Sequence, residues 1–302
     1  MDKLKVAIIG SGNIGTDLLV KAMRSPYLDC SMFIGRHFNS PGMNKASSMG
    51  VKISDLSIEA IERDHDCCQL VFDATSALDH KKHWPILKKL NIKVIDMTPS
   101  AIGEMCIPAL NIEHCLNYDN VNMVTCGGQA SIPLAHVIGN THPEVKYIEV
   151  VSSIASRSAG PATRINLDEY VETTEKGLKD FSGCRKTKAI LILNPAQPPI
   201  DMQTTIFAKV DKPDIDILIK EVDIMVKKIQ AYVPGYRLLI PPLIESGRIV
   251  IMVKIQGLGD YLPKYAGNMD IINCAAIAMA ESYAKQNNTC RVTEVENAKN
   301  FN

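Results

Sequence analysis

The sequence predicts an α/β protein in which a doubly wound parallel sheet is followed by a second, α+β domain. Three observations support this: a glycine-rich turn follows the first apolar run, short strands alternate with helices up to about residue 125, and longer strands with few helices occupy the part beyond. The chain has 302 residues, a length typical of two domains with a core each.

The first element is a β-strand over residues 4–9, an apolar, β-branched run that ends at Gly-Ser-Gly-Asn-Ile-Gly. Gly10 permits a tight turn, Gly12 lets the backbone approach a pyrophosphate, and Gly15 lets the next helix pack closely on the strand. The first turn of that helix offers unpaired N–H groups to phosphates. A strand, a glycine turn and a helix in this order predict a dinucleotide site of the Rossmann type. Its expected residues are Gly10, Ser11, Gly12, Asn13, Ile14 and Gly15.

The rest of the first 125 residues repeats the alternation of strands and helices. We expect helices near residues 43–49 and 83–90, with a parallel sheet built from the strands around them. Residues 1–125 are therefore predicted to form the dinucleotide-binding Rossmann domain. Its further strands are expected at residues 31–34, 69–73, 93–96 and 122–125.

The second strand ends without the carboxylate that NAD sites usually place there to bind the ribose hydroxyls. Residues 35–40 read Gly-Arg-His-Phe-Asn-Ser instead. Arg36 could meet the 2′-phosphate of NADP, or it could be a solvent-facing arginine on a loop. The choice between NAD and NADP therefore stays open.

Residues 126–266 have a different character and are predicted to form the α+β domain. One amphipathic helix is expected at residues 215–230, between long strands. An alanine-rich helix at 267–286 is expected to pack back on the first domain, and residues 287–302 are polar and expected to be a disordered tail. The long strands are expected at residues 146–153, 189–193, 204–210 and 249–255.

Cys126 stands where a strand ends and two glycines follow, in the sequence Val-Thr-Cys-Gly-Gly-Gln-Ala. A helix is expected to begin near residues 131–133, where a proline is well tolerated in the first turn. A helix N-terminus favours a thiolate, so we expect the pKa of this thiol to be lowered. The same N–H groups can stabilise an oxyanion on a carbonyl that the thiolate attacks. Cys126 is the candidate nucleophile, and the other eight cysteines are predicted to fill the cores.

Composition excludes several classes of protein. The 33 basic and 33 acidic side chains give no net charge, which argues against a nucleic-acid binder. No apolar run approaches the roughly 18 residues that span a bilayer, and the N-terminus is unlike a signal peptide, so a cytoplasmic location is expected. The cysteines lack CxxC spacing and the seven histidines lack HxH or HxxxH spacing. No metal site is therefore predicted.

The chain resembles the acylating acetaldehyde dehydrogenases over residues 5 to about 285. The resemblance implies the two-domain build of the semialdehyde dehydrogenases, with a Rossmann-type sheet and an α+β catalytic and dimerisation domain. It also implies the reaction: acetaldehyde or another short aldehyde and coenzyme A give acyl-CoA, while NAD or NADP is reduced. The matching stretches are IIGSGNIGTDL, VFDATSA, IDMTPSAIG, NVNMVTCGGQASIP, SRSAGPATRINLDEY, ILNPAQPP, QAYVPGYRL and YLPKYAGNMDI.

The resemblance also implies roles for single residues. Cys126 would attack the aldehyde, the thiohemiacetal would pass a hydride to the nicotinamide, and coenzyme A would take the acyl group from the resulting thioester. Asn166 matches a polar active-site position, and Asn268 matches a position that approaches the nicotinamide; either asparagine could instead be a turn or helix cap. Further cofactor contacts are expected at Thr75, Ser76, Ser158, Ala159 and Gly160.

Thr204 departs from the family, whose members typically carry at this position an aspartate proposed as a general base. Threonine cannot accept a proton at neutral pH. Asp201 lies three residues away, and an odd offset in a strand points to the opposite face. Base catalysis at this position is therefore in doubt, which leaves a lowered thiol pKa or a water to take that role.

The resemblance further implies a homodimer and, as in bacterial members active in aromatic hydrocarbon catabolism, a partner aldolase that cleaves 4-hydroxy-2-oxoacids. Whether this chain keeps that partner is open. It could also be an acyl-CoA or semialdehyde reductase on another substrate in a biosynthetic pathway. A semialdehyde dehydrogenase that uses phosphate or water would generally pair the cysteine with a downstream histidine, but no histidine follows His142. A catalytically impaired, cofactor-binding partner subunit is supported by Thr204 alone.

Overall fold

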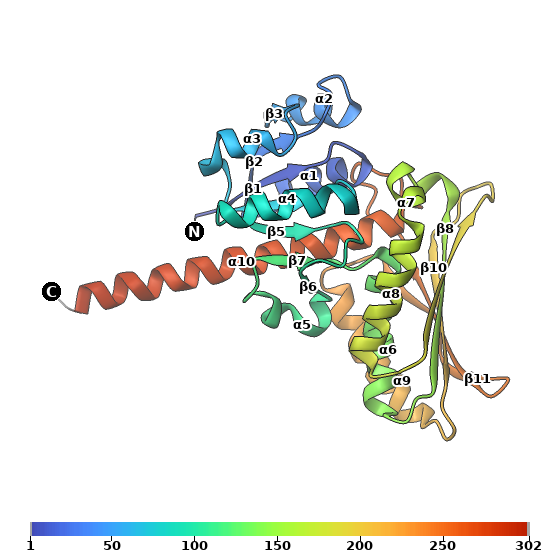
Figure 1. The fold of residues 1–302 in the computed structure, drawn as a ribbon. Coiled ribbons are helices and arrows are strands. Elements are labelled where there is room, and N and C mark those ends of the chain that lie inside the picture. The colour runs from blue at the N-terminus through green and yellow to red at the C-terminus, as the bar shows by residue number, and fades with distance from the viewer. Residues whose placement is uncertain (1, 301–302) are drawn as a thin grey trace.

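The computed structural model describes residues 2–300, with side chains described for residues 2–160 and 163–288. Two β-sheets lie side by side, and a long C-terminal helix runs along the first of them (Figure 1). The predicted fold class is confirmed: a Rossmann-type parallel sheet is joined to a second, mixed sheet. No helix within residues 2–300 is both long and apolar enough to cross a membrane.

The first sheet has seven parallel strands in the order β3-β2-β1-β4-β5-β7-β6. Every residue of β1 except Lys5 is buried, as are all four residues of β4, because helices cover both faces of the sheet. The strand order reverses between β1 and β4, so the crevice where such sheets bind ligands opens at the carboxyl ends of these two strands. The strands are β1 (Leu4–Ile9), β2 (Leu28–Ile34), β3 (Lys52–Ser54), β4 (Leu70–Asp73), β5 (Lys93–Asp96), β6 (Glu104–Met105) and β7 (Asn120–Asn122). The helices are α1 (Asn13–Arg24), α2 (Pro41–Ser48), α3 (Glu59–Arg63), α4 (Ala77–Lys89) and α5 (Pro108–Cys115).

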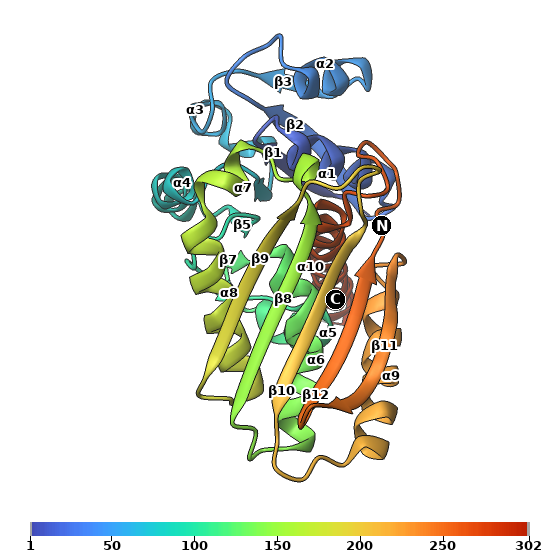
Figure 2. The ribbon, with the colours of Figure 1, turned by 90° about the vertical axis from the view of Figure 1, so that its right-hand side faces the viewer.

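The second sheet has five strands in the order β11-β12-β10-β8-β9, all antiparallel neighbours except the pair β8 and β9. Buried and half-buried residues alternate along β8 and β10, because α6, α8 and α9 cover one face while the other is open (Figure 2). The strands are β8 (Tyr147–Ala155), β9 (Thr187–Asn194), β10 (Met202–Lys209), β11 (Tyr236–Glu245) and β12 (Arg248–Ile255). The helices are α6 (Cys126–Thr141), α7 (Pro161–Ile165), α8 (Leu167–Ser182), α9 (Ile215–Gln230) and α10 (Gly267–Asn300).

Helix α10 returns from the second sheet and packs against the first. Its buried face contributes small and large apolar residues, among them Ala276, Met279 and Tyr283, to the core that contains Leu18 and Phe72. A buried ion pair fixes the helix to α1, since Nζ of Lys21 lies 2.8 Å from a carboxylate oxygen of Asp17 and 2.8 Å from one of Asp270.

Residues 287–300 are helical, whereas the sequence predicted a disordered tail over 287–302. No proline or glycine follows Gly267, so nothing in the sequence stops a helix that has already formed. Adding a residue to an existing helix gains a hydrogen bond without the cost of a new nucleus. Residues 301–302 lie outside the described part of the chain.

Several element boundaries also differ from the prediction. β1, β5 and α9 have the predicted bounds, but the strands β3, β6 and β11 and the helices α5, α7 and α8 were not predicted. The strand expected at 122–125 is β7, which ends at Asn122 because Val124 leaves the extended region with φ 60°. Helix α6 begins at Cys126, about five residues earlier than expected, and Pro133 therefore lies inside it.

Candidate active site

The glycine turn between β1 and α1 is packed tightly against the protein at Gly10 and Gly15 and is open at Gly12. Gly10 has φ 115°, and a Cβ there would lie 2.4 Å from the carbonyl oxygen of Ala74. A Cβ on Gly15 would lie 1.8 Å from the carbonyl oxygen of Gly10. Gly12 caps α1 with no side-chain hydrogen bond, and a Cβ on it would meet nothing within 4 Å. The turn is therefore tightly packed on the protein side and open at Gly12, next to the free N–H groups of α1.

Cys126 is the first residue of α6, and its helix is capped by Thr125. The backbone N–H of Gly128 donates to Oγ1 of Thr125 at 2.8 Å, and this oxygen lies 2.7 Å from Oγ1 of Thr174 on α8. Val124 adopts the left-handed conformation, which is strained for a β-branched residue. The backbone turn that presents the thiol is thus sharp, and it is fixed to both α6 and α8.

One cavity joins the cysteine to Ile14, in the first turn of α1 after the glycine turn. Five of the residues predicted from sequence lie on its wall, although they come from five different elements or loops of the chain. They are Ile14, Thr75, Cys126, Asn166 and Asn268. The other lining residues are Met97, Thr98, Pro99, Val124, Thr125, Thr163, Tyr170, Met269 and Ile272.

The remaining predicted residues do not line this cavity. Arg36 is exposed on the loop after β2. Ser76 caps α4, accepting from the N–H of Asp79 at 3.1 Å. Ser158 is buried just behind the wall, where its carbonyl oxygen accepts from Nδ2 of Asn268 at 3.5 Å. Ala159 and Gly160 follow it in the chain.

Comparisons with known proteins match most of the length of this chain. The family described as "Semialdehyde dehydrogenase, NAD binding domain" matches residues 5–115, and "Prokaryotic acetaldehyde dehydrogenase, dimerisation" matches residues 126–263. The acetaldehyde dehydrogenase of Pectobacterium atrosepticum is 61% identical over 281 residues, covering 92% of this chain and 95% of its own. That of Spirochaeta aurantia is 61% identical over 282 residues, covering 93% and 95%. This chain belongs to the acetaldehyde dehydrogenase family.

Two solved structures share the fold. Aspartate semialdehyde dehydrogenase II of Vibrio cholerae superposes with a TM-score of 0.62 at 14% identity, covering 93% of this chain and 98% of that one. Aspartate semialdehyde dehydrogenase of Candida albicans, solved with NADP, gives a TM-score of 0.60 at 9% identity, covering 93% and 100%. At these identities the likeness establishes the architecture of both sheets.

The glycine turn and the cavity beside it fit the dinucleotide that this enzyme family uses. Gly12 leaves room for a phosphate beside the first N–H groups of α1. Asn268 is 3% exposed, and its Oδ1 finds no hydrogen-bond donor among the described residues. A buried acceptor of this kind matches an amide group such as that of a nicotinamide ring.

The Cys126 thiol differs from the prediction in its acidity. Burial raises the pKa of Cys126 to about 11, although the neighbouring Tyr170 hydroxyl and the backbone N–H of Gly127 favour the thiolate. The predicted lowering is therefore wrong. Desolvation of the charged sulfur outweighs the N–H groups at the start of the helix.

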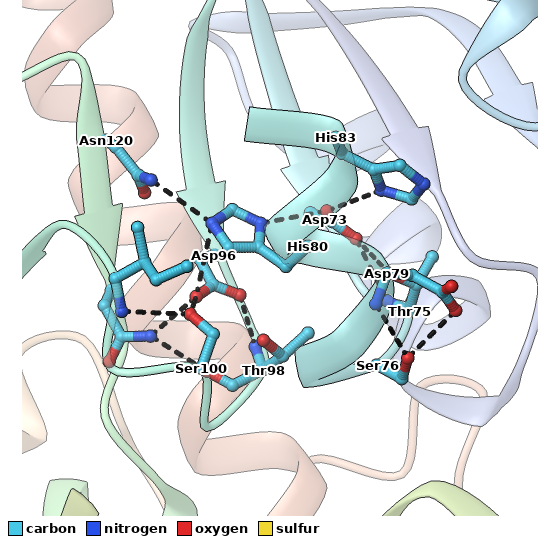
Figure 3. A network of polar contacts seen from close by, with 12 residues as sticks. Asp73, Thr75, Ser76, Asp79, His80, His83, Asp96, Thr98, Ser100 and Asn120 are labelled. Carbon is cyan, nitrogen blue, oxygen red and sulfur yellow. Dashed lines mark hydrogen bonds and ion pairs between the residues drawn. The ribbon is translucent and has the colours of Figure 1, made fainter. Parts of the chain in front are cut away.

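Behind the cavity lies a buried network of two aspartates and two histidines that sequence reasoning missed (Figure 3). Nδ1 of His80 and Nδ1 of His83 lie 3.0 and 2.9 Å from Oδ2 of Asp73, and Nε2 of His80 lies 3.5 Å from Oδ2 of Asp96. Asn120 adds a contact of 3.2 Å to the same nitrogen of His80. The signal was present in the sequence: Asp73 and Asp96 each end a strand, and His80 and His83 are spaced to share one face of α4.

This network holds the two loops that form one wall of the cavity. Asp73 accepts from the N–H and Oγ1 of Thr75, and Asp96 accepts from the N–H of Thr98 at 2.8 Å. Burial alone would raise the pKa of Asp73, but the hydrogen bonds from His80 and His83 hold it well below its usual range. Burial raises the pKa of Asp96 to about 6. One ionised aspartate, shared between two histidines, therefore orders the loop after β4.

Tyr170 is the second residue of note that sequence reasoning missed. It lies on α8 one turn after Asn166, so both side chains share the helix face that lines the cavity. Its hydroxyl lies over Gly127, the residue that follows Cys126. The spacing i, i+4 from a predicted site residue was the available signal.

Proposed function

We propose that this enzyme is CoA-acylating. An aldehyde, coenzyme A and NAD⁺ or NADP⁺ give acyl-CoA, the reduced cofactor and a proton, through a thioester on Cys126. The observation that carries this proposal is that Cys126, at the start of α6, shares one cavity with Ile14 of the glycine turn and with Asn268. A nucleophilic sulfur and a dinucleotide site in one cavity are what oxidation of a thiohemiacetal requires.

The residues of the chain have separate roles in this reaction. The sulfur of Cys126 bonds to the carbonyl carbon of the aldehyde, and the N–H groups at the start of α6 stabilise the oxyanion that forms. Asn166, which lines the same cavity, orients the same oxygen. Bound NAD or NADP supplies the hydride acceptor. The coenzyme A thiol then attacks the thioester carbon, and Cys126 leaves as a thiolate, ready for another aldehyde.

The test is an assay of the purified enzyme with acetaldehyde, coenzyme A and NAD or NADP, followed by the absorbance of the reduced cofactor. We expect reduction that depends on coenzyme A and is lost in Cys126→Ala. A matched control is Cys184→Ala, which removes a buried thiol that follows the C-terminal end of α8 and does not line the cavity. Turnover that persists in Cys126→Ala, or that ignores coenzyme A, would refute the proposal.

We infer further that two copies of the chain pair through the open face of the second sheet. Figure 2 shows this face without a covering helix. It carries apolar side chains such as Ile192 and Leu243, the latter opposite Val250 and 38% exposed. The family that matches residues 126–263 is described by its dimerisation. Light scattering of the wild-type protein should give twice the mass of the chain, and Ile192→Glu should shift the mass toward that of the monomer. An unchanged mass in Ile192→Glu would exclude this face as the dimer interface.

A further inference from the structure

Three hydroxyl groups lie close to Gly127, the residue that follows Cys126, or to one another. The first is that of Tyr170, a side chain 6% exposed on the inner wall of the cavity. A Cβ placed on Gly127 would lie 2.0 Å from this hydroxyl oxygen and 3.0 Å from Oγ of Ser152. Both hydroxyls therefore lie over Gly127, the residue next to Cys126, in space that a side chain at this position would fill.

The third hydroxyl belongs to Thr204, the position where the family pattern has an aspartate. Thr204 and Ser152 are directly opposite each other on β10 and β8, and their hydroxyl oxygens are 2.9 Å apart. Both side chains are almost completely buried. Asp201 lies elsewhere, with Oδ2 3.6 Å from Nζ of Lys254. The acidic group expected at this place is thus replaced by a neutral pair of hydroxyls that leads to Tyr170.

The position of Tyr170 is itself fixed. Its carbonyl oxygen accepts from Oγ1 of Thr174 at 2.6 Å. Oγ1 of Thr174 also contacts Oγ1 of Thr125, the cap of α6. The turn of α8 that carries Tyr170 is therefore fastened to the turn that carries Cys126. Yet the Tyr170 hydroxyl makes no hydrogen bond of regular geometry with a described residue. A buried donor that is held in place without an acceptor is available to a group that becomes charged during the reaction.

We propose that the Tyr170 hydroxyl is the hydrogen-bond donor that stabilises the Cys126 sulfur anion, and that Ser152 and Thr204 align it. Thr204 donates to Ser152, Ser152 to Tyr170, and Tyr170 to the sulfur, so that each donor is strengthened by the one behind it. The thiol proton leaves to water, and no bond to hydrogen breaks on Tyr170. Burial keeps the pKa of Tyr170 well above its ordinary value, so the phenol remains a neutral donor.

The proposal rests on the proposed function in that Cys126 is taken as the nucleophile, but its test needs no turnover. The rate of alkylation of Cys126 by iodoacetamide is measured by mass spectrometry of the peptide that contains it, at several pH values between about 7 and 10. In Tyr170→Phe, loss of a hydrogen bond to a charged group should raise the thiol pKa by about one unit. The thiolate population at each pH then falls about tenfold. Because a more basic thiolate is a better nucleophile, the alkylation rate should fall by only about threefold at every pH.

Matched variants separate this role from a structural one. Ser152→Ala and Thr204→Val should slow alkylation in the same direction but by less, and Ser152→Ala supplies the answer if Tyr170→Phe does not fold. Tyr236→Phe removes another fully buried hydroxyl, which donates to the carbonyl oxygen of Ala130 in α6 at 2.8 Å, and should leave the rate unchanged. Wild-type alkylation rates in folded Tyr170→Phe and Ser152→Ala would overturn the proposal. Absence of acyl-CoA formation would count against the proposed function and would leave these rates unaffected.

Discussion

Replacing Gly127 by alanine is expected to lower the free energy of unfolding, although alanine is normally the better residue in a helix. In an open helix the change would stabilise by about 0.5–1 kcal/mol. Here the added Cβ would lie 2.0 Å from the Tyr170 hydroxyl oxygen, 3.0 Å from Oγ of Ser152 and 3.1 Å from Cζ of Tyr170. The buried ring must move, and overpacking of this kind costs about 1–3 kcal/mol. The net expectation is a loss of about 1–2 kcal/mol.

Urea-induced unfolding, followed by circular dichroism, measures this loss, and Tyr170→Phe identifies its origin. Without the hydroxyl, the nearest atoms to the new Cβ lie at 3.0–3.1 Å, so a shift of a few tenths of an ångström suffices. The two substitutions should therefore couple by about 1 kcal/mol in a double-mutant cycle, with the double variant more stable than their sum.

Gly177→Ala is the matched control, since Gly177 is also a helical glycine near Cys126. A Cβ there would lie 2.6 Å from Cδ1 of Ile132, the end of a flexible side chain that can rotate away. It should show no coupling to Tyr170→Phe. If Gly127→Ala were neutral or stabilising and uncoupled to Tyr170→Phe, the hydroxyl would not lie over Gly127, and the reasoning on this site would fail.

Three other predictions follow from the charges and loops of the site. Because burial raises the pKa of Cys126 to about 11, its alkylation rate should rise about tenfold per pH unit from pH 7 to 9 without a plateau; a midpoint near pH 7 would contradict this. Burial alone would lower the pKa of His80, but the contacts with Asp73 and Asp96 outweigh burial, so the pKa of His80 is raised above its ordinary value. The stability this histidine contributes is therefore present below its ordinary pKa and lost as pH rises through the raised value. The deficit of His80→Gln in urea unfolding should be largest near pH 6 and shrink by pH 9, and a constant deficit would exclude the charged pair. Arg36→Asp should weaken NADP binding far more than NAD binding in fluorescence titrations if Arg36 meets a 2′-phosphate, and equal losses would refute that role.

The first sheet could be predicted because its signals are local. β1 is a run of apolar, β-branched residues that ends at a glycine turn, and both features depend only on neighbouring residues. The start of α6 was misplaced because Thr125, which caps it, was read as the end of a strand. Helix α8 has apolar residues at helical spacing, as in Leu167, Tyr170 and Leu178, but its many charged residues obscured the pattern.

The site could be predicted only in part, because its energetics depend on pairings that one sequence does not reveal. Cys126 and the glycine turn carry local signatures. The contact between Ser152 and Thr204 depends on the register of β8 against β10, which is set by packing of the whole sheet. The acidity of Cys126 depends on how deeply the second sheet buries it. A helix N-terminus indicates which form of a thiol is favoured, but the burial that opposes it becomes known only from the fold.

A nucleophile with a raised pKa needs compensation, and the magnitudes show how much. An increase of two units above the ordinary value reduces the thiolate population near neutral pH about a hundredfold. The greater basicity of that thiolate returns about a factor of ten, since nucleophilicity rises with about half the change in pKa. The remaining factor of about ten is incurred even though the Tyr170 hydroxyl already favours the thiolate of Cys126. Loss of the Tyr170 hydroxyl would therefore lower the reactivity of Cys126 further. This neutral phenol, aligned by two further hydroxyls, matters because the enzyme has threonine where its relatives are expected to carry a base.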